Sequence, residues 1–144
     1  MSLNEEERAI LVTREYEKAL SFYSQAEANA QIEIWDVVAN RLYYATFHAV
    51  SALLVHDGHK VGTHKGAVLQ FGLHYVQKDI FTKEEARFYS QLQSYREKAD
   101  YNINWTSNKQ DLLPLMPIAK GLIDKIGKMI YHMERHFSHD LTNH

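Results

Sequence analysis

The sequence predicts an all-α protein: an antiparallel up-and-down helical bundle of four long helices plus a shorter one. Apolar residues recur at helical spacing along most of the chain, and helix-capping residues precede these runs. No run alternates apolar and polar residues in the way of a half-buried strand. The 144 residues include only 2 prolines and 6 glycines, which is typical of a helix-rich chain.

Composition narrows the class of protein. Hydrophobic residues make up 45% and charged residues 24%, as in ordinary globular domains, and no run reaches the roughly 18 apolar residues of a membrane helix. The absence of cysteine excludes disulfides and cysteine-ligated zinc. The acidic N-terminus lacks a signal-peptide pattern, so we expect a cytoplasmic protein with no membrane partner. A net charge of −2 excludes a chain that is basic throughout, but not a local basic patch for nucleic acid.

Residues 34–57 are predicted to form the central helix. This run is apolar on nearly every side, which is typical of a helix surrounded by others, and Gly58 is placed to end it. Arg41 and His48, seven residues apart, share one face and interrupt an apolar stripe. Because a buried arginine without a partner is costly, this face is predicted to meet a polar segment from another helix.

Two further helices flank the central one in the sequence. The first is expected to follow a cap at Ser2 or Asn4 and to run to about Asn29. The third is expected over residues 64–78, after a cap at Thr63. Its inward-facing residues are predicted to be Val68, Leu69, Phe71, Gly72, Val76 and Ile80.

The fourth helix is expected to begin at Thr82, where Glu85 three residues later completes a capping box, and to end near residues 101–105. Its apolar side is predicted to extend to Ile103. Caps at residues 106–108 precede a last helix that reaches about residue 137. We therefore expect one domain over residues 1–137 and a loose C-terminal tail over residues 138–144.

The 9 histidines raise the possibility of a metal site. His132 and His136 are four residues apart, and His139 follows. Met133 stands where a zincin motif has glutamate, and no inward carboxylate partner is evident. His56, His59 and His64 around the following loop are similarly weak candidates for metal ligands. The sequence therefore predicts no metal site and no cofactor.

The segment Gly58–Gly66 contains glycines, lysines and histidines. Its spacing is not that of a P-loop. One interpretation is a helix connection in which Thr63 caps the next helix. The other is an anion site at the start of that helix, such as the loop of a small-nucleotide sensor, and the two interpretations are compatible.

A polar set on two helices is the remaining candidate for chemistry. Arg41 and His48 lie on the second helix, whereas Arg96, Asp100 and Tyr101 lie on the fourth. These residues form either a structural ion-pair network, in which Asp100 neutralises Arg96 or Arg41, or a polar cleft. In a cleft the arginines would hold phosphate and a titratable group would move a proton.

Three blocks carry a resemblance to a known family: Arg41-Leu-Tyr-Tyr-Ala-Thr-Phe-His48, Gly62-Thr-His64-Lys-Gly, and Arg96-Glu-Lys-Ala-Asp100-Tyr101. In this order they resemble a HEPN domain, and most closely its small stand-alone prokaryotic branch with an R-x-x-A-D-Y motif. The resemblance implies a helical bundle that forms a homodimer. It also implies a ribonuclease of a toxin–antitoxin or defence-type system, often encoded beside a minimal nucleotidyltransferase that acts as antitoxin.

The resemblance also implies roles for individual residues. In nuclease members a histidine follows the motif arginine after four to six residues, but Tyr101, Asn102 and Ile103 occupy those positions here. A phenol is a weak base at neutral pH. The residues implied in catalysis are therefore Arg96, Tyr101 and His48, and those implied in binding RNA or nucleotide are Arg41, Arg96, Asp100, His64 and Lys65.

Two functions follow as expectations from this resemblance. The first is a protein that binds RNA or nucleotide and acts as a metal-independent ribonuclease toxin. The alternative is a non-catalytic interaction module that pairs with a minimal nucleotidyltransferase.

Overall fold

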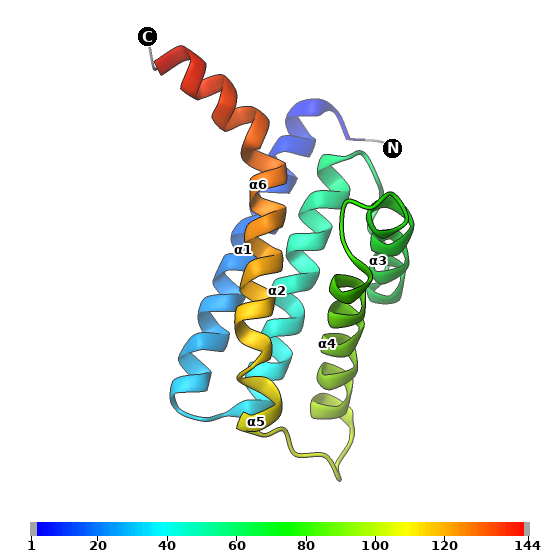
Figure 1. Cartoon of the computed structure of the whole chain (residues 1–144), viewed down its shortest axis with the longest axis vertical. Helices are drawn as coiled ribbons and strands as arrows, with labels where there is room; N and C mark the ends of the chain where they lie inside the picture. Colours follow the sequence, from blue (N-terminus) through cyan, green and yellow to red (C-terminus); the bar gives the residue numbers. More distant parts are fainter. Residues whose placement is uncertain (1–2, 143–144) are drawn as a thin grey trace.

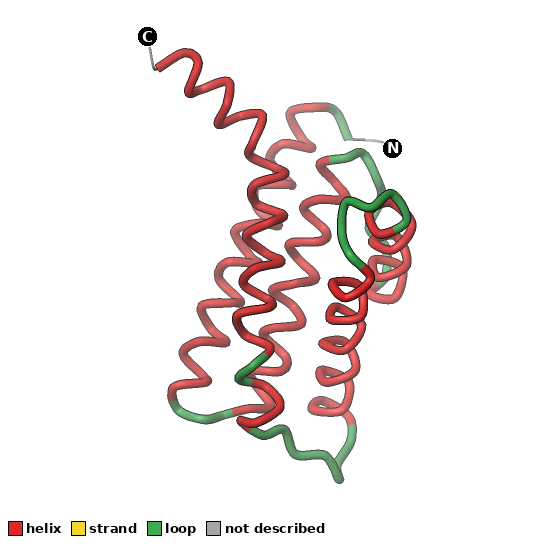
Figure 2. Tube along the Cα trace, in the orientation of Figure 1, coloured by secondary structure: helices red, strands yellow, loops and turns green. Residues whose placement is uncertain are grey.

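The computed structural model describes the backbone of residues 3–142 and the side chains of residues 3–131. Every regular element within residues 3–142 is helical, so the predicted fold class is confirmed (Figure 2). The elements, in chain order, are α1 (Glu5–Gln31), α2 (Trp35–His56), α3 (His64–Phe71), the π-helical turn η1 (Gly72–Val76), α4 (Lys83–Tyr101), α5 (Lys109–Leu112) and α6 (Leu115–Thr142).

The four long helices alternate in direction, which makes the bundle up-and-down (Figure 1). α2 is the central element, because it packs against α1, α4 and α6 as well as α3. Residues 49–55 are all buried, and these seven positions cover the whole circumference of a helix. The prediction of an enclosed central helix is therefore confirmed.

Two tyrosines join α1 to α6. The hydroxyl of Tyr16 donates to the carbonyl oxygen of Ile123 at 3.0 Å, and that of Tyr23 donates to the carbonyl oxygen of Met116 at 3.1 Å. Gly127 makes the first contact possible, because a Cβ atom at this position would collide with the Tyr16 hydroxyl. A glycine in the middle of a long helix therefore has a packing role here.

The caps predicted at Asn4, Thr63 and Thr82 are confirmed, whereas Asn108 caps the short α5 and not the long last helix. Asn4 caps α1 through a capping box with Glu7, and Thr82 caps α4 through a capping box with Glu85. The Oγ1 atom of Thr63 accepts a hydrogen bond from the third backbone N–H of α3 at 2.8 Å. These bonds satisfy N–H groups that have no partner within the helix.

The third helix differs from its prediction. Regular α-helix ends at Phe71, and the wider turn η1 follows. Its inward face is set by Ala67, Phe71 and Tyr75, which are four residues apart and buried. Leu69 therefore points outward and is 68% exposed, and Ile80, beyond the helical segment, is 41% exposed, so the inward placement of both was wrong.

Two features at other helix ends also differ from expectation. Ile103 is exposed, because α4 ends at Tyr101 before it, so its predicted place on the apolar side was wrong. α6 continues to Thr142, beyond the end at about residue 137 that the sequence predicts for the last helix.

The histidine set at the C-terminal end, His132, His136 and His139, lies outside the residues whose side chains are described. Among residues 3–131, no group of three histidine, cysteine or acidic side chains is placed to hold a metal ion. Within the described chain, no helix is both long and apolar enough to cross a membrane.

Candidate functional site

Arg96 is the centre of a polar cluster between α2 and α4. Its side chain is buried, with only 7% of the residue exposed. The Cζ atom lies 5.0 Å from the ring centroid of Tyr43, 5.7 Å from that of Tyr44 and 5.9 Å from that of Tyr101. Aromatic faces attract a guanidinium cation. Three tyrosine rings therefore help to stabilise this buried charge.

Asp100 gives Arg96 an incomplete counter-charge. The carboxylate Oδ2 lies 3.7 Å from Nη1, one helical turn along α4, which is long for a charge-assisted hydrogen bond. The Nε atom of Arg96 is buried and has no hydrogen-bond partner. A guanidinium can donate five hydrogen bonds, so Arg96 retains donors that its surroundings do not use.

His64, at the start of α3, contacts two of these tyrosines, Tyr43 and Tyr44. Its Nδ1 is 2.7 Å from the hydroxyl oxygen of Tyr43, and its ring also contacts those of Tyr44 and Phe47. Burial raises the pKa of Tyr43 to about 12, while Arg96 acts in the opposite direction. Burial lowers the pKa of His64, and the charges of Arg96 and His48 lower it further. The pair is therefore a phenol and a neutral imidazole at neutral pH.

Arg41 is turned toward α1. Its Nε donates to Oε1 of Gln25 at 2.7 Å, and its guanidinium lies 5.2 Å from the ring centroid of Phe22. Its Nη1 donates to Oδ1 of Asn40 at 2.6 Å, and Nδ2 of Asn40 donates to Oδ2 of Asp100 at 3.2 Å. Arg41 and Asp100 are thus linked through the Asn40 amide instead of by a direct ion pair.

His48 also contacts α1. Its Nδ1 is 2.7 Å from Oε2 of Glu15, and its ring stacks on Phe22 with the centroids 5.4 Å apart. These contacts hold the imidazole on the side of α2 that faces α1, whereas Arg96 approaches from α4. The structure therefore does not place His48 in contact with Arg96.

The outer parts of the cluster are Tyr101 and Lys65. Tyr101 is 75% exposed in the last turn of α4, with its ring beside Arg96. Lys65 is exposed in the first turn of α3, and no ion pair engages it within residues 3–131. Of the residues expected from the sequence, Arg96, Asp100, Tyr101 and His64 come together. Arg41 joins them through Asn40.

Three residues of this cluster were missed in the sequence as site residues: Asn40, Tyr43 and Tyr44. The sequence did contain a signal for them. Asn40, Tyr43, Tyr44 and Phe47 are spaced three or four residues apart, so they lie on adjoining faces of a helix. Glu15 and Gln25 on α1 gave no such signal. They look like ordinary polar residues of an amphipathic helix.

The arrangement offers three chemical capacities. Arg96 supplies a buried positive charge with free donor capacity, His64 supplies a neutral imidazole that can accept a proton, and Tyr101 supplies an exposed aromatic face and hydroxyl. Cation, proton acceptor and stacking surface are the groups that recognition and cleavage of a phosphodiester require.

Comparison with known proteins places this cluster in a family context. The model of the HEPN domain matches residues 12–129. A UPF0332 protein of Thermotoga maritima is 29% identical over 133 residues, which cover 92% of this chain and 99% of that protein.

Two relatives from Methanocaldococcus jannaschii are named as candidate toxins. One is 30% identical over 66% of this chain and 69% of its own length, and the other is 25% identical over 79% of this chain and 78% of its own length. The family model spans most of the chain and includes every residue of the cluster, from Glu15 to Tyr101. The chain therefore belongs to the HEPN domain family.

Proposed function

We propose that this HEPN protein binds RNA at the Arg96 cluster and cleaves it without a metal ion, as the toxin of a toxin–antitoxin pair. The observation that carries the proposal is that Arg96 and His64 contact the same pair of tyrosines, Tyr43 and Tyr44. A cation and a neutral imidazole on one aromatic platform are suited to a phosphodiester and its 2′-hydroxyl. Two relatives named as candidate toxins support the biological role.

In the proposed reaction, His64 accepts the 2′-hydroxyl proton. The 2′-oxygen then attacks phosphorus, the bond from phosphorus to the 5′-oxygen breaks, and a 2′,3′-cyclic phosphate forms. The leaving 5′-oxygen takes a proton from the Tyr101 hydroxyl, which is exposed in the last turn of α4. Arg96, oriented by Asp100, offsets the negative charge that develops on the phosphoryl oxygens, and Lys65 attracts the flanking phosphate.

The test is a cleavage and binding assay with a panel of single-stranded RNAs. His64→Ala is expected to lower the cleavage rate by about 100-fold or more, as for loss of a general base, while RNA binding persists. Arg96→Ala is expected to weaken both activities. Arg87→Ala is the matched control, because Arg87 is an exposed arginine on the same helix.

His48→Ala separates the two histidines, because His48 is held by Glu15 on α1. A loss of cleavage in His48→Ala but not in His64→Ala would reassign the base. Wild-type protein that neither binds nor cuts any RNA of the panel would overturn the proposal.

A second candidate function is a non-catalytic module that pairs with a minimal nucleotidyltransferase. The observation that favours it is the internal chain of contacts from Gln25 through Arg41, Asn40 and Asp100 to Arg96, which makes a structural role plausible for each member. In that case Arg96→Ala would destabilise the fold without changing RNA binding.

We propose a homodimer in either case, as the family resemblance implies. Co-expression with a minimal nucleotidyltransferase tests the pairing, and light scattering of the chain alone tests the dimer.

A further inference from the structure

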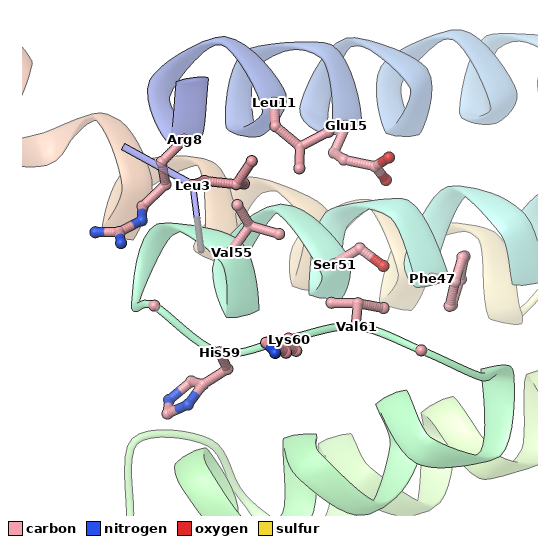
Figure 3. Close-up of a pocket in the computed structure, with 12 residues that line it drawn as sticks. Leu3, Arg8, Leu11, Glu15, Phe47, Ser51, Val55, His59, Lys60 and Val61 are labelled. Carbon is pink, nitrogen blue, oxygen red and sulfur yellow. The ribbon is translucent and has the colours of Figure 1, made fainter. Parts of the chain in front are cut away.

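A cavity lies between the start of α1 and the C-terminal half of α2, and it shares Glu15 with the Arg96 cluster. It has a volume of about 510 Å³, within the range typical of small-molecule sites. Leu11 and Glu15 descend into it from α1, Ser51 and Val55 face it from α2, and Val61 closes it from the loop before α3 (Figure 3).

Small residues line two sides of the cavity. Ser51 stands on α2 between the larger Phe47 and Val55. Gly58 and Gly62 form part of the loop wall, and a Cβ atom at either position would meet no other atom within 4 Å. The loop itself is held in place, because Nε2 of Gln70 donates to the Lys60 carbonyl oxygen at 2.7 Å. The cavity is therefore built from three anchored elements.

Ser51 places a buried hydroxyl group in the wall of this cavity. The residue is only 3% exposed, and its hydroxyl oxygen has no hydrogen-bond partner. Thr46 on the same helix has the bond that Ser51 lacks: its hydroxyl donates to the carbonyl oxygen of Leu42, four residues earlier, at 3.0 Å. Buried hydroxyls are normally hydrogen-bonded, so the Ser51 hydroxyl retains unused hydrogen-bonding capacity beside the cavity.

The charges around the cavity favour an anion. Arg8 and Lys60 line it, and no carboxylate forms an ion pair with either one within residues 3–131. The acidic side chain of the lining, Glu15, is already engaged by His48 at 2.7 Å. His59 also lines the cavity, and five of the other lining residues are apolar: Leu3, Leu11, Phe47, Val55 and Val61.

We propose that this cavity is a binding site for a small organic anion with an apolar body and a single carboxylate or phosphate head group. The apolar body lies among Leu11, Phe47 and Val55, the Ser51 hydroxyl hydrogen-bonds to a polar atom of the ligand, and Arg8 and Lys60 attract the head group. This site is distinct from the proposed RNA site and does not depend on it.

The test compares three ligands with the same eight-carbon body: octanoate, octyl phosphate and octanol. Binding is followed on the full chain by amide chemical shifts, which are expected to change at Ser51, Lys60 and Val61. Both anions are expected to bind about tenfold more tightly than the neutral alcohol, and the stronger of the two identifies the head group. Equal affinity for octanol, or shifts confined to other parts of the chain, would overturn the proposal.

Variants make the assignment specific. Arg8→Gln/Lys60→Gln is expected to lower octanoate affinity about tenfold, whereas Arg14→Gln/Lys18→Gln, which removes the same two charge types from exposed positions of α1, should leave it unchanged. Ser51→Val, which narrows the cavity and removes the hydroxyl, is expected to lower affinity by a larger factor than Ser51→Ala. Equal losses in the two double variants, or unchanged affinity in Ser51→Ala if the valine variant does not fold, would contradict the site.

Discussion

The hydroxyl oxygen of Tyr43 on α2 and the Nδ1 atom of His64 on α3 lie 2.7 Å apart, and this hydrogen bond fixes the start of the short helix on the central one. The Tyr43 ring also lies against the guanidinium of Arg96. One side chain of α2 thus positions groups from two other helices.

Tyr43→Phe is expected to lower the free energy of unfolding by about 0.5–1.5 kcal/mol, the usual contribution of one such hydrogen bond. The ring remains beside Arg96, so the change isolates the hydroxyl. Urea unfolding measures the effect. Tyr44→Phe is the matched control, because Tyr44 is the next residue on the same helix and its ring is half-buried. A loss in the control as large as in Tyr43→Phe would show that the hydrogen bond to His64 contributes little.

Acid is expected to destabilise the fold around α3. The pKa of His64 lies below its ordinary value of 6.5, chiefly because of burial, and so does that of His59. Below pH 6.5 the unfolded chain therefore binds more protons than the folded chain, and stability falls as the pH drops through the lowered pKa values. Above pH 6.5 both states are neutral at these two histidines, and their contribution is constant.

Urea unfolding at a series of pH values from 8 to 5 measures this dependence. The variant His59→Asn/His64→Asn should lose less stability over the same range than the wild type, because it lacks both titrating groups. An equal slope in the two proteins below pH 6.5 would contradict the assignment to these residues.

Asn40 and Asp100 are expected to be energetically coupled. The Asn40 amide accepts from Arg41 and donates to Asp100, so either alanine variant breaks the same link. A double-mutant cycle with Asn40→Ala and Asp100→Ala should give a coupling free energy of about 0.5–1.5 kcal/mol. Combining Asn40→Ala with Asp124→Ala, on α6, provides a pair that should be additive, and additivity in both pairs would refute the link.

Gly127→Ala is expected to destabilise the bundle by about 1–3 kcal/mol, because the new methyl group would displace the Tyr16 ring and its hydrogen bond to Ile123. Gly121→Ala in the same helix is the matched control, since its Cβ would meet no atom within 4 Å. That variant should stabilise the protein by up to about 1 kcal/mol through helix propensity. Thermal unfolding distinguishes the two signs directly.

The fold was predictable because its signals are local. Capping boxes at Asn4 and Thr82 mark helix starts, and the all-round apolar pattern of α2 identifies the element that other helices enclose. The face of the third helix was predicted less well. The π-helical turn at Gly72–Val76 changes the periodicity, and no residue type announces such a turn in a sequence.

The candidate site was predictable only in part. Periodicity places Arg41 and His48 on one face of α2, but it does not say which neighbouring helix that face meets. In the structure both residues contact α1, because Arg41 bonds to Gln25 and His48 to Glu15. His64 instead shares the Tyr43 ring with Arg96. Interhelical partners depend on the rotation of each helix about its axis, which a single sequence does not encode in readable form.

The enclosure of α2 also determines where the molecule can move. Amide hydrogens of residues 49–55 exchange with solvent only when the whole bundle opens, so they should be the slowest in a hydrogen-exchange experiment. The α3–η1 segment packs against fewer neighbours and can open locally at a lower free-energy cost. Local opening of the segment that carries His64 is therefore expected to leave Tyr43 and Arg96 in place.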